Sequence, residues 1–155
     1  METTEYANRL NQISSIVIGA AIEVHKTLGP GLYEEIYEEC LKKELDIQGV
    51  RYQSQVTFPV IYKGIDTGKT YRFDLLVEDE VVVELKAVDE LSKINEVQLV
   101  SYLRLLNKRL GLLINFNVVR LVDGVRRRVN NFGTPPIVQA QASAISTDAS
   151  ASSIQ

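Results

Sequence analysis

The chain has 155 residues, 45% of them hydrophobic, and a formal net charge of −3, which suits one domain with a single core. Its only cysteine, Cys40, excludes an intramolecular disulfide and a cysteine-ligated zinc or iron–sulfur centre within the chain. No apolar run approaches the roughly 18 residues of a membrane span, and the acidic, polar start is unlike a signal peptide, so we expect a cytoplasmic protein without membrane contact.

Two helices are expected first. Apolar residues recur at helical spacing from Ile13 to Leu28 and predict a helix over about residues 8–27. A Gly-Pro-Gly break follows, and a second apolar stripe from Leu32 to Leu45 predicts a helix that ends near Gly49. Cys40 lies on the apolar side of this second helix, where it is expected to be a small core residue.

The remaining pattern is mostly that of strands. Residues 51–62 are expected to form a strand with an edge or bulge at Pro59, and residues 71–77 and 81–87 a hairpin around a turn at 78–80. Ser92 is expected to cap a helix from Lys93 to about Asn107. A buried strand at 110–116 and a final hairpin of 118–122 with 125–131 are expected to follow.

The expected order is ααβββαββ, in an α/β fold in which helices flank a mixed β-sheet. Residues 1–133 are expected to form the domain. After Pro135-Pro136 the composition shifts to Ala, Ser, Gln and Thr, so residues 134–155 are expected to be a disordered low-complexity tail.

Three charged residues interrupt the apolar hairpin at 71–87. Because Glu84 and Lys86 are two residues apart, they point to the same face of a strand. If residues 78–80 form a three-residue loop, Val77 pairs with Val81 and Asp74 falls opposite Glu84. Two carboxylates and an ammonium then meet at one place, which suits a hard divalent cation and a phosphate; the alternative is a simple cross-strand ion pair.

Charge is unevenly distributed along the chain. Residues 1–50 hold nine acids and four bases, whereas residues 104–128 hold seven bases and one acid. This basic segment either tracks phosphates or guards a sheet edge. On a strand, at most two of the three consecutive residues Arg126, Arg127 and Arg128 can face one ligand.

These motifs resemble a known family. The spacing of Gly31, Glu34 and Tyr37 is similar to that of the GxxExxY family of the PD-(D/E)XK nuclease superfamily, and Asp74 with Glu84-x-Lys86 is similar to the superfamily's core motif, although Phe73 stands in the place of its Pro. The pair Gln98 and Tyr102 resembles the helix of RecB-type exonuclease domains. The resemblance covers roughly residues 10–132.

The resemblance implies a restriction-endonuclease-like core and a role for each matching residue. Asp74, Glu84 and the carbonyl of Leu85 would bind Mg²⁺ or Mn²⁺, and Lys86 would orient or activate the attacking water. Glu34 would complete the metal site or hold a metal-bound water. Gln98 and Tyr102 match positions that contact nucleic acid or brace the lysine. His25 is a looser match to a metal-binding histidine, and a structural role is favoured for it. From the basic segment, and not from the resemblance, Arg126 and Arg128 are expected to contact the nucleic acid.

Two functions of different classes follow. The first is a metal-dependent nuclease that acts on nucleic acid, with DNA as the expected substrate. The second is a non-catalytic module that retains the nuclease fold and binds nucleic acid or a protein partner, with a homodimer also compatible. The intact set of Asp74, Glu84 and Lys86 favours the enzyme, because a degenerate module is expected to have lost one of them.

Overall fold

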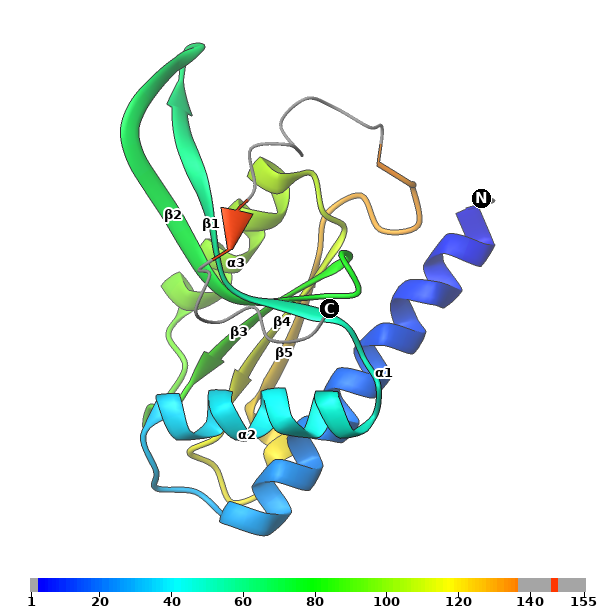
Figure 1. Cartoon of the computed structure of the whole chain (residues 1–155), viewed down its shortest axis with the longest axis vertical. Coiled ribbons are helices and arrows are strands. Elements are labelled where there is room, and N and C mark those ends of the chain that lie inside the picture. The colour runs from blue at the N-terminus through cyan, green and yellow to red at the C-terminus, as the bar shows by residue number, and fades with distance from the viewer. Residues whose placement is uncertain (1–2, 137–145, 148–155) are drawn as a thin grey trace.

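A computed structural model describes residues 3–136 and 146–147 of the chain. In chain order, two helices precede a mixed sheet, and a third helix connects strand β3 to strand β4 (Figure 1). The elements are α1 (Thr3–Leu28), α2 (Glu34–Ile47), β1 (Tyr52–Tyr62), β2 (Ile65–Val77), β3 (Val81–Lys86), α3 (Lys93–Leu106), β4 (Leu110–Asn115), the 3-10 helix η1 (Leu121–Gly124), β5 (Val125–Val129) and β6 (Ser146–Thr147).

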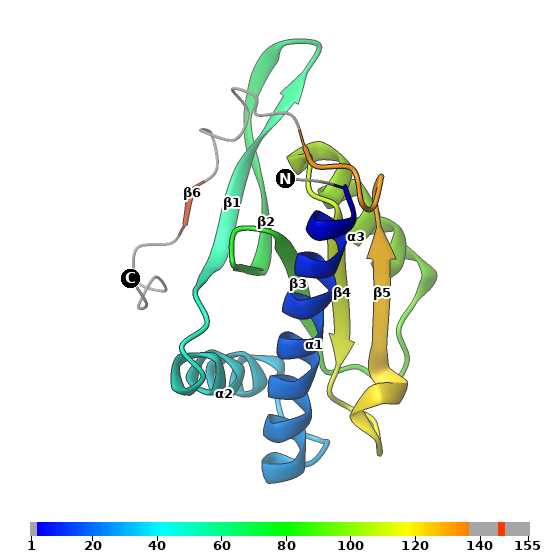
Figure 2. The same cartoon turned by 90° about the vertical axis from the view of Figure 1, so that its right-hand side faces the viewer.

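The strand order within the described residues is β5-β4-β3-β2-β1-β6. Only β3 and β4 are parallel, because α3 connects them as a crossover, and the other neighbours are antiparallel. Helices α1 and α2 cover one face of the sheet and α3 covers the other (Figures 1 and 2). The expected α/β architecture with a helix-flanked mixed sheet is therefore confirmed.

Two separate apolar cores reflect this three-layer arrangement. One joins α1 and α2 to alternate residues of β3 and β4, and the other joins α3 to the opposite faces of β1, β2, β3 and β4. Helix α3 begins at the predicted cap: the Ser92 hydroxyl accepts from the Asn95 N–H, and the Asn95 side chain accepts from the Ser92 N–H. The bulge expected at Pro59 is also present, as a register shift between Pro59 and Ile61.

The predicted order ααβββαββ does not match in full, because η1 and β6 are additional elements, and the strand expected at residues 118–122 does not form. Residues 121–124 form η1 instead, and β5 pairs with β4. Every residue of β4 is buried, so β4 offers β5 a full partner, while the 3-10 turn buries Leu121 in the α1-side core. Gly124 permits this turn, because a Cβ there would lie 2.2 Å from the Asn115 carbonyl oxygen.

The segment expected to be a disordered tail, 134–155, is described only in part. Ser146 and Thr147 pair with Thr57 and Val56 as β6, where the sequence indicated no regular structure. The Thr134 carbonyl accepts a hydrogen bond of 2.6 Å from Arg109 Nε. The rest of that prediction, at 137–145 and 148–155, lies outside the described residues.

Candidate active site

Asp74 and Glu84 meet where β2 and β3 stop pairing through their main chains. The ladder runs from Val77 opposite Val81 to Leu75 opposite Val83, which is the register that the three-residue loop predicts. Beyond it, side chains replace main-chain partners: Glu84 Oε1 accepts from the Asp74 N–H and Asp74 Oδ2 accepts from the Leu85 N–H, both at 2.8 Å. These reciprocal bonds hold both carboxylates between the same two strands.

Burial makes the two negative charges unfavourable. It raises the pKa of Glu84 to about 8, and the negative charge of Asp74 adds to this increase. Burial also raises the pKa of Asp74, against the opposing effects of the Leu85 N–H, Gln55 and Lys86. The pair therefore resists ionisation unless positive charge is brought to it.

Glu34 and Lys86 complete the charged group. Glu34 lies in the first turn of α2, and its pKa is raised by burial and then by Asp74, while Lys86 lowers it. Lys86 also lowers the pKa values of Asp74 and Glu84. One lysine thus interacts electrostatically with three acids that come from α2, β2 and β3.

The Gly31 to Tyr37 segment explains how Glu34 reaches this place. Gly31 has a φ of 96°, a backbone conformation that residues with a Cβ rarely adopt. The Tyr37 hydroxyl donates to the Gly29 carbonyl at 2.6 Å and accepts from the Leu32 N–H at 3.1 Å. The Tyr37 ring stacks on Phe116 with a centroid distance of 4.5 Å. The glycine and the tyrosine therefore fix the loop from which α2 begins at Glu34.

Two further polar residues at the site were not anticipated from the sequence. Gln55 of β1 has a φ of 50°, and its Nε2 donates to both carboxylate oxygens of Glu38, at 2.7 and 2.9 Å, and more weakly to Asp74 Oδ1 at 3.4 Å. An unusual backbone conformation at such a place is typical of functional sites. Glu38 could have been found from its position one helical turn after Glu34.

These residues surround an open cleft of about 380 Å³. Acids from α2 form one wall, and β1 and β2 form the other. The lining residues are Tyr33, Glu34, Glu35, Glu38, Gln55, Arg72 and Asp74. A cleft with several carboxylates and one guanidinium is suited to a cation that in turn attracts an anion.

Helix α3 brings one of its two candidate residues toward the site. Tyr102 is buried among Phe58, Tyr71 and Phe73, and its pKa is raised by burial and then by Glu84. Gln98, one turn earlier, is exposed. Tyr102 therefore lies within electrostatic range of the carboxylates, whereas Gln98 is accessible to a ligand from solution.

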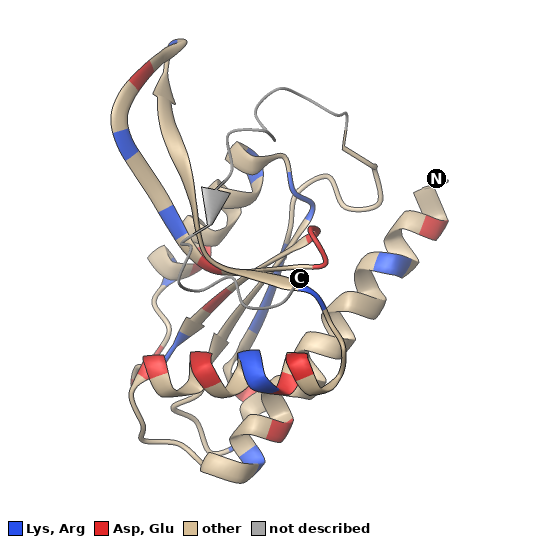
Figure 3. Cartoon of the chain, viewed as in Figure 1, with Lys and Arg blue, Asp and Glu red and all other residues tan. Residues whose placement is uncertain are grey.

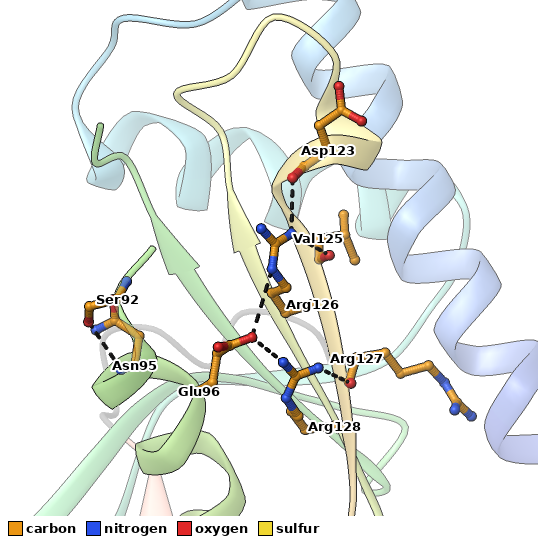
Figure 4. Close-up of polar contacts among 8 residues, drawn as sticks. All are labelled: Ser92, Asn95, Glu96, Asp123, Val125, Arg126, Arg127 and Arg128. Carbon is orange, nitrogen blue, oxygen red and sulfur yellow. Dashed lines mark hydrogen bonds and ion pairs between the residues drawn. The ribbon is translucent and has the colours of Figure 1, made fainter. Parts of the chain in front are cut away.

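Arg126 and Arg128 share a sheet face with Glu84. Leu113 of β4 pairs with Glu84 on one side and Arg126 on the other, so Arg126 stands two strands, roughly 10 Å, from Glu84. Both arginines form ion pairs with Glu96 of α3, Arg126 Nε at 3.8 Å and Arg128 more closely (Figure 4). Arg127 points the other way, and its Nη2 donates to Asn11 Oδ1 of α1 at 2.8 Å.

His25 has a structural contact. Its Nε2 lies 2.8 Å from the Val118 carbonyl oxygen, so it links α1 to the loop before η1, and the side chain is 8% exposed. Within residues 3–136 and 146–147, no three His, Cys, Asp or Glu side chains are grouped closely enough to hold a metal ion by themselves. A metal held by Asp74 and Glu84 would thus need main-chain, solvent or substrate oxygens as its other ligands.

No helix of the described residues combines the length and apolar character that crossing a bilayer requires. No curated protein and no solved structure matches the chain. A family model described as the PD-(D/E)XK nuclease superfamily does match, over residues 11–128, and this range contains both strands that carry the acids, Lys86 and all three helices in whole or in part. The chain belongs to the PD-(D/E)XK nuclease superfamily.

Proposed function

We propose that this protein is a nuclease that uses a divalent metal ion, Mg²⁺ or Mn²⁺, to hydrolyse phosphodiester bonds of DNA. The observation that carries the proposal is the reciprocal Asp74–Glu84 pair, whose burial opposes its ionisation and which Lys86 and Glu34 adjoin. Buried carboxylates of raised pKa beside a lysine in a cleft are typical of catalytic centres.

The donor set fits a hard cation. Each carboxylate uses one oxygen for its 2.8 Å main-chain bond and keeps lone pairs for a metal. Asp74, Glu84 and the Leu85 carbonyl would hold the ion, and Glu34 of α2 would hold a metal-bound water. Oxygen ligands and retained waters are the usual environment of Mg²⁺. When bound, the ion would act as a Lewis acid on the scissile phosphate.

The chain's other residues would bind and orient the substrate. Lys86, within electrostatic range of all three acids, would stabilise the negative charge that develops as water attacks. Tyr102 would brace the lysine side of the site, and exposed Gln98 would contact nucleic acid. Arg126 and Arg128 would hold phosphates along the sheet face, in competition with Glu96.

Within the superfamily we assign the chain to the GxxExxY family. The support is local: Gly31 adopts a positive φ, Tyr37 fastens the loop before α2, and Glu34 lies beside Asp74 and Lys86. Each residue of the motif thus has its own part in building the site.

One observation favours a second function, that of a non-catalytic binding module. Asp74 and Glu84 already have main-chain partners, and the described residues contain no group of three metal-ligating side chains. Such a module would bind nucleic acid or a protein partner through the same surfaces without hydrolysing a bond.

A cleavage assay with a matched variant separates the two functions. Supercoiled DNA, linear DNA and RNA would be incubated with EDTA, Mg²⁺ or Mn²⁺. We expect cleavage of DNA with metal only and its loss in Asp74→Asn, while the control Asp123→Asn, which changes an exposed carboxylate on η1, stays active. Absence of cleavage together with absence of calorimetric Mg²⁺ and Mn²⁺ binding to the wild-type protein would overturn the nuclease in favour of the binding module.

A further inference from the structure

The strands β1 and β2 continue beyond the rest of the sheet as a two-stranded arm. All residues from 61 to 70, on both sides of the turn, are exposed. Figures 1 and 2 show this hairpin projecting past the helices and the other strands. An isolated two-stranded hairpin is marginally stable in water, so burial within this chain does not account for the arm.

The arm combines basic side chains with exposed apolar ones, which suits an anionic ligand that also has apolar edges. Its tip exposes Ile61, Tyr62 and Ile65 by 52%, 62% and 67%, and Lys63 Nζ lies 5.4 Å from the centre of the Tyr62 ring. Its charged residues within 61–70 are two bases and one acid, Lys63, Lys69 and Asp66, and Arg72 follows on β2.

Strand β2 contains an irregularity within the arm. Pro59 pairs with Thr70 but Ile61 pairs with Asp66, so three residues of β2, 67–69, lie opposite the single residue Val60. Hydrogen bonds within this bulge, from the Gly68 N–H to Asp66 Oδ1 and from the Lys69 N–H to Thr67 Oγ1, fix its shape. In Figure 3 the arm carries mostly basic segments, whereas α2 carries mostly acidic ones.

The arm is continuous with the candidate active site. Arg72 and Asp74 lie two residues apart on β2 and line the same cleft, and Arg72 lowers the pKa of Asp74. Asp74 and Ile65, at the start of β2, are nine residues apart, but the bulge makes this segment equivalent to about seven strand residues, so it spans roughly 23 Å. One turn of B-form DNA measures about 34–36 Å, so the tip would lie roughly two thirds of a turn from a phosphate at Asp74.

We propose that this arm is a grip for duplex DNA that lies in the major groove about two thirds of a helical turn to one side of the scissile phosphate. The major groove admits a two-stranded β-ribbon, and the apolar tip can pack against base edges while the lysines contact flanking phosphates. The inference rests on the proposed nuclease function and specifies its substrate: duplex DNA with about seven base pairs on the arm side of the cut.

Two arm variants and a matched control test this. The first replaces residues 60–69 by Asn-Gly, which joins Pro59 to its partner Thr70 by a two-residue turn. The second, Lys63→Ala/Lys69→Ala, leaves the backbone intact, so it still tests the role of the arm if the shortened protein does not fold. The control, Lys26→Ala/Lys43→Ala, removes the same charge from exposed positions on α1 and α2.

Binding to fluorescent 30-base-pair DNA would be measured by anisotropy in Ca²⁺ without Mg²⁺, over a series of salt concentrations. For the lysine variant we expect an affinity loss on the order of tenfold near 0.15 M salt and a log–log salt slope smaller by about 1.8 than that of the control. Wild-type affinity should rise with the length of flanking duplex until about seven base pairs, and the variant with the shortened arm should reach its plateau earlier.

The outcomes distinguish the arm from the nuclease. If the protein cleaves DNA but its affinity depends neither on the arm nor on duplex length, the proposed role of the arm alone is overturned. Tighter binding of single-stranded than of duplex DNA would also overturn that role. Arm variants that change only the sedimentation of a dimer would show an interface between copies and also overturn the proposal. Arm-dependent duplex binding without cleavage in any metal would support the arm and overturn the nuclease.

Discussion

Replacing Glu84 by Gln tests whether the buried carboxylate pair is held ready for a cation. The substitution removes one negative charge while its amide oxygen can still accept the hydrogen bond from the Asp74 N–H. If burial makes this charge unfavourable, the metal-free variant should be more stable than the wild type at alkaline pH. A purely structural Glu84–Lys86 ion pair predicts the opposite, because the variant would lose the pair.

The size of the effect follows from the raised pKa of Glu84, about 8 against an ordinary value of 4.5. Between these pH values the folded protein keeps a proton that the unfolded chain has lost, so folding stability falls as pH rises and the cost is complete above pH 8. At about 1.4 kcal/mol per pH unit the upper limit is about 5 kcal/mol. Because the charges of Asp74 and Lys86 also contribute to this free energy, we expect Glu84→Gln to raise the free energy of unfolding by about 2 kcal/mol, or Tm by roughly 4–8 °C.

The assay is thermal unfolding by circular dichroism in EDTA, at pH 4.5 and at pH 8.5, of the wild type, Glu84→Gln and the control Asp123→Asn. The gain in Tm should appear at pH 8.5 and be almost lost at pH 4.5, where the folded protein holds the proton and the unfolded chain is about half protonated. Saturating Mg²⁺ should then stabilise the wild type but not Glu84→Gln, because only the former retains both acids. Destabilisation of Glu84→Gln at pH 8.5, or an equal effect at both pH values, would refute the reasoning.

Three further outcomes are expected. Lys86→Ala should leave DNA affinity nearly intact while the single-turnover cleavage rate falls on the order of 10²–10³-fold; an equal loss of affinity would make Lys86 part of a binding surface. Glu96→Gln should tighten DNA binding in an anisotropy titration, because it releases Arg126 and Arg128, and unchanged affinity would place these arginines outside the interface. Truncation after Pro136 keeps the Thr134 carbonyl bonded to Arg109, so Tm should stay within about 2 °C; a larger drop by calorimetry would mean that β6 stabilises the sheet.

Local sequence signals determined the elements that build the candidate site. The three residues between Val77 and Val81 set the hairpin register, and that register alone brings Asp74 toward Glu84. Ser92 and Asn95 form the capping box that starts α3 at the predicted residue. These predictions succeeded because turn length, strand alternation and helix capping depend on neighbours in the chain.

Contacts between distant segments were not available from the sequence. The Gln55 side chain bonds to Glu38 because α2, a distant segment, packs beside it. Residues 118–122 form no strand because β4 is the better partner for β5. The pairing of Arg126 and Arg128 with Glu96 likewise requires α3 to cover that face.

Periodicity and short-range geometry are enough to predict the α/β class, the positions of α1, α2 and α3, and the convergence of Asp74, Glu84 and Lys86. That Glu34 joins them from another layer, and that Arg109 is buried, depends on tertiary contacts. The extension of β1 and β2 beyond the rest of the sheet is likewise a feature of the tertiary structure. The physical reason is that burial and electrostatic environment are set by whichever segment packs alongside, and that segment comes from elsewhere in the chain.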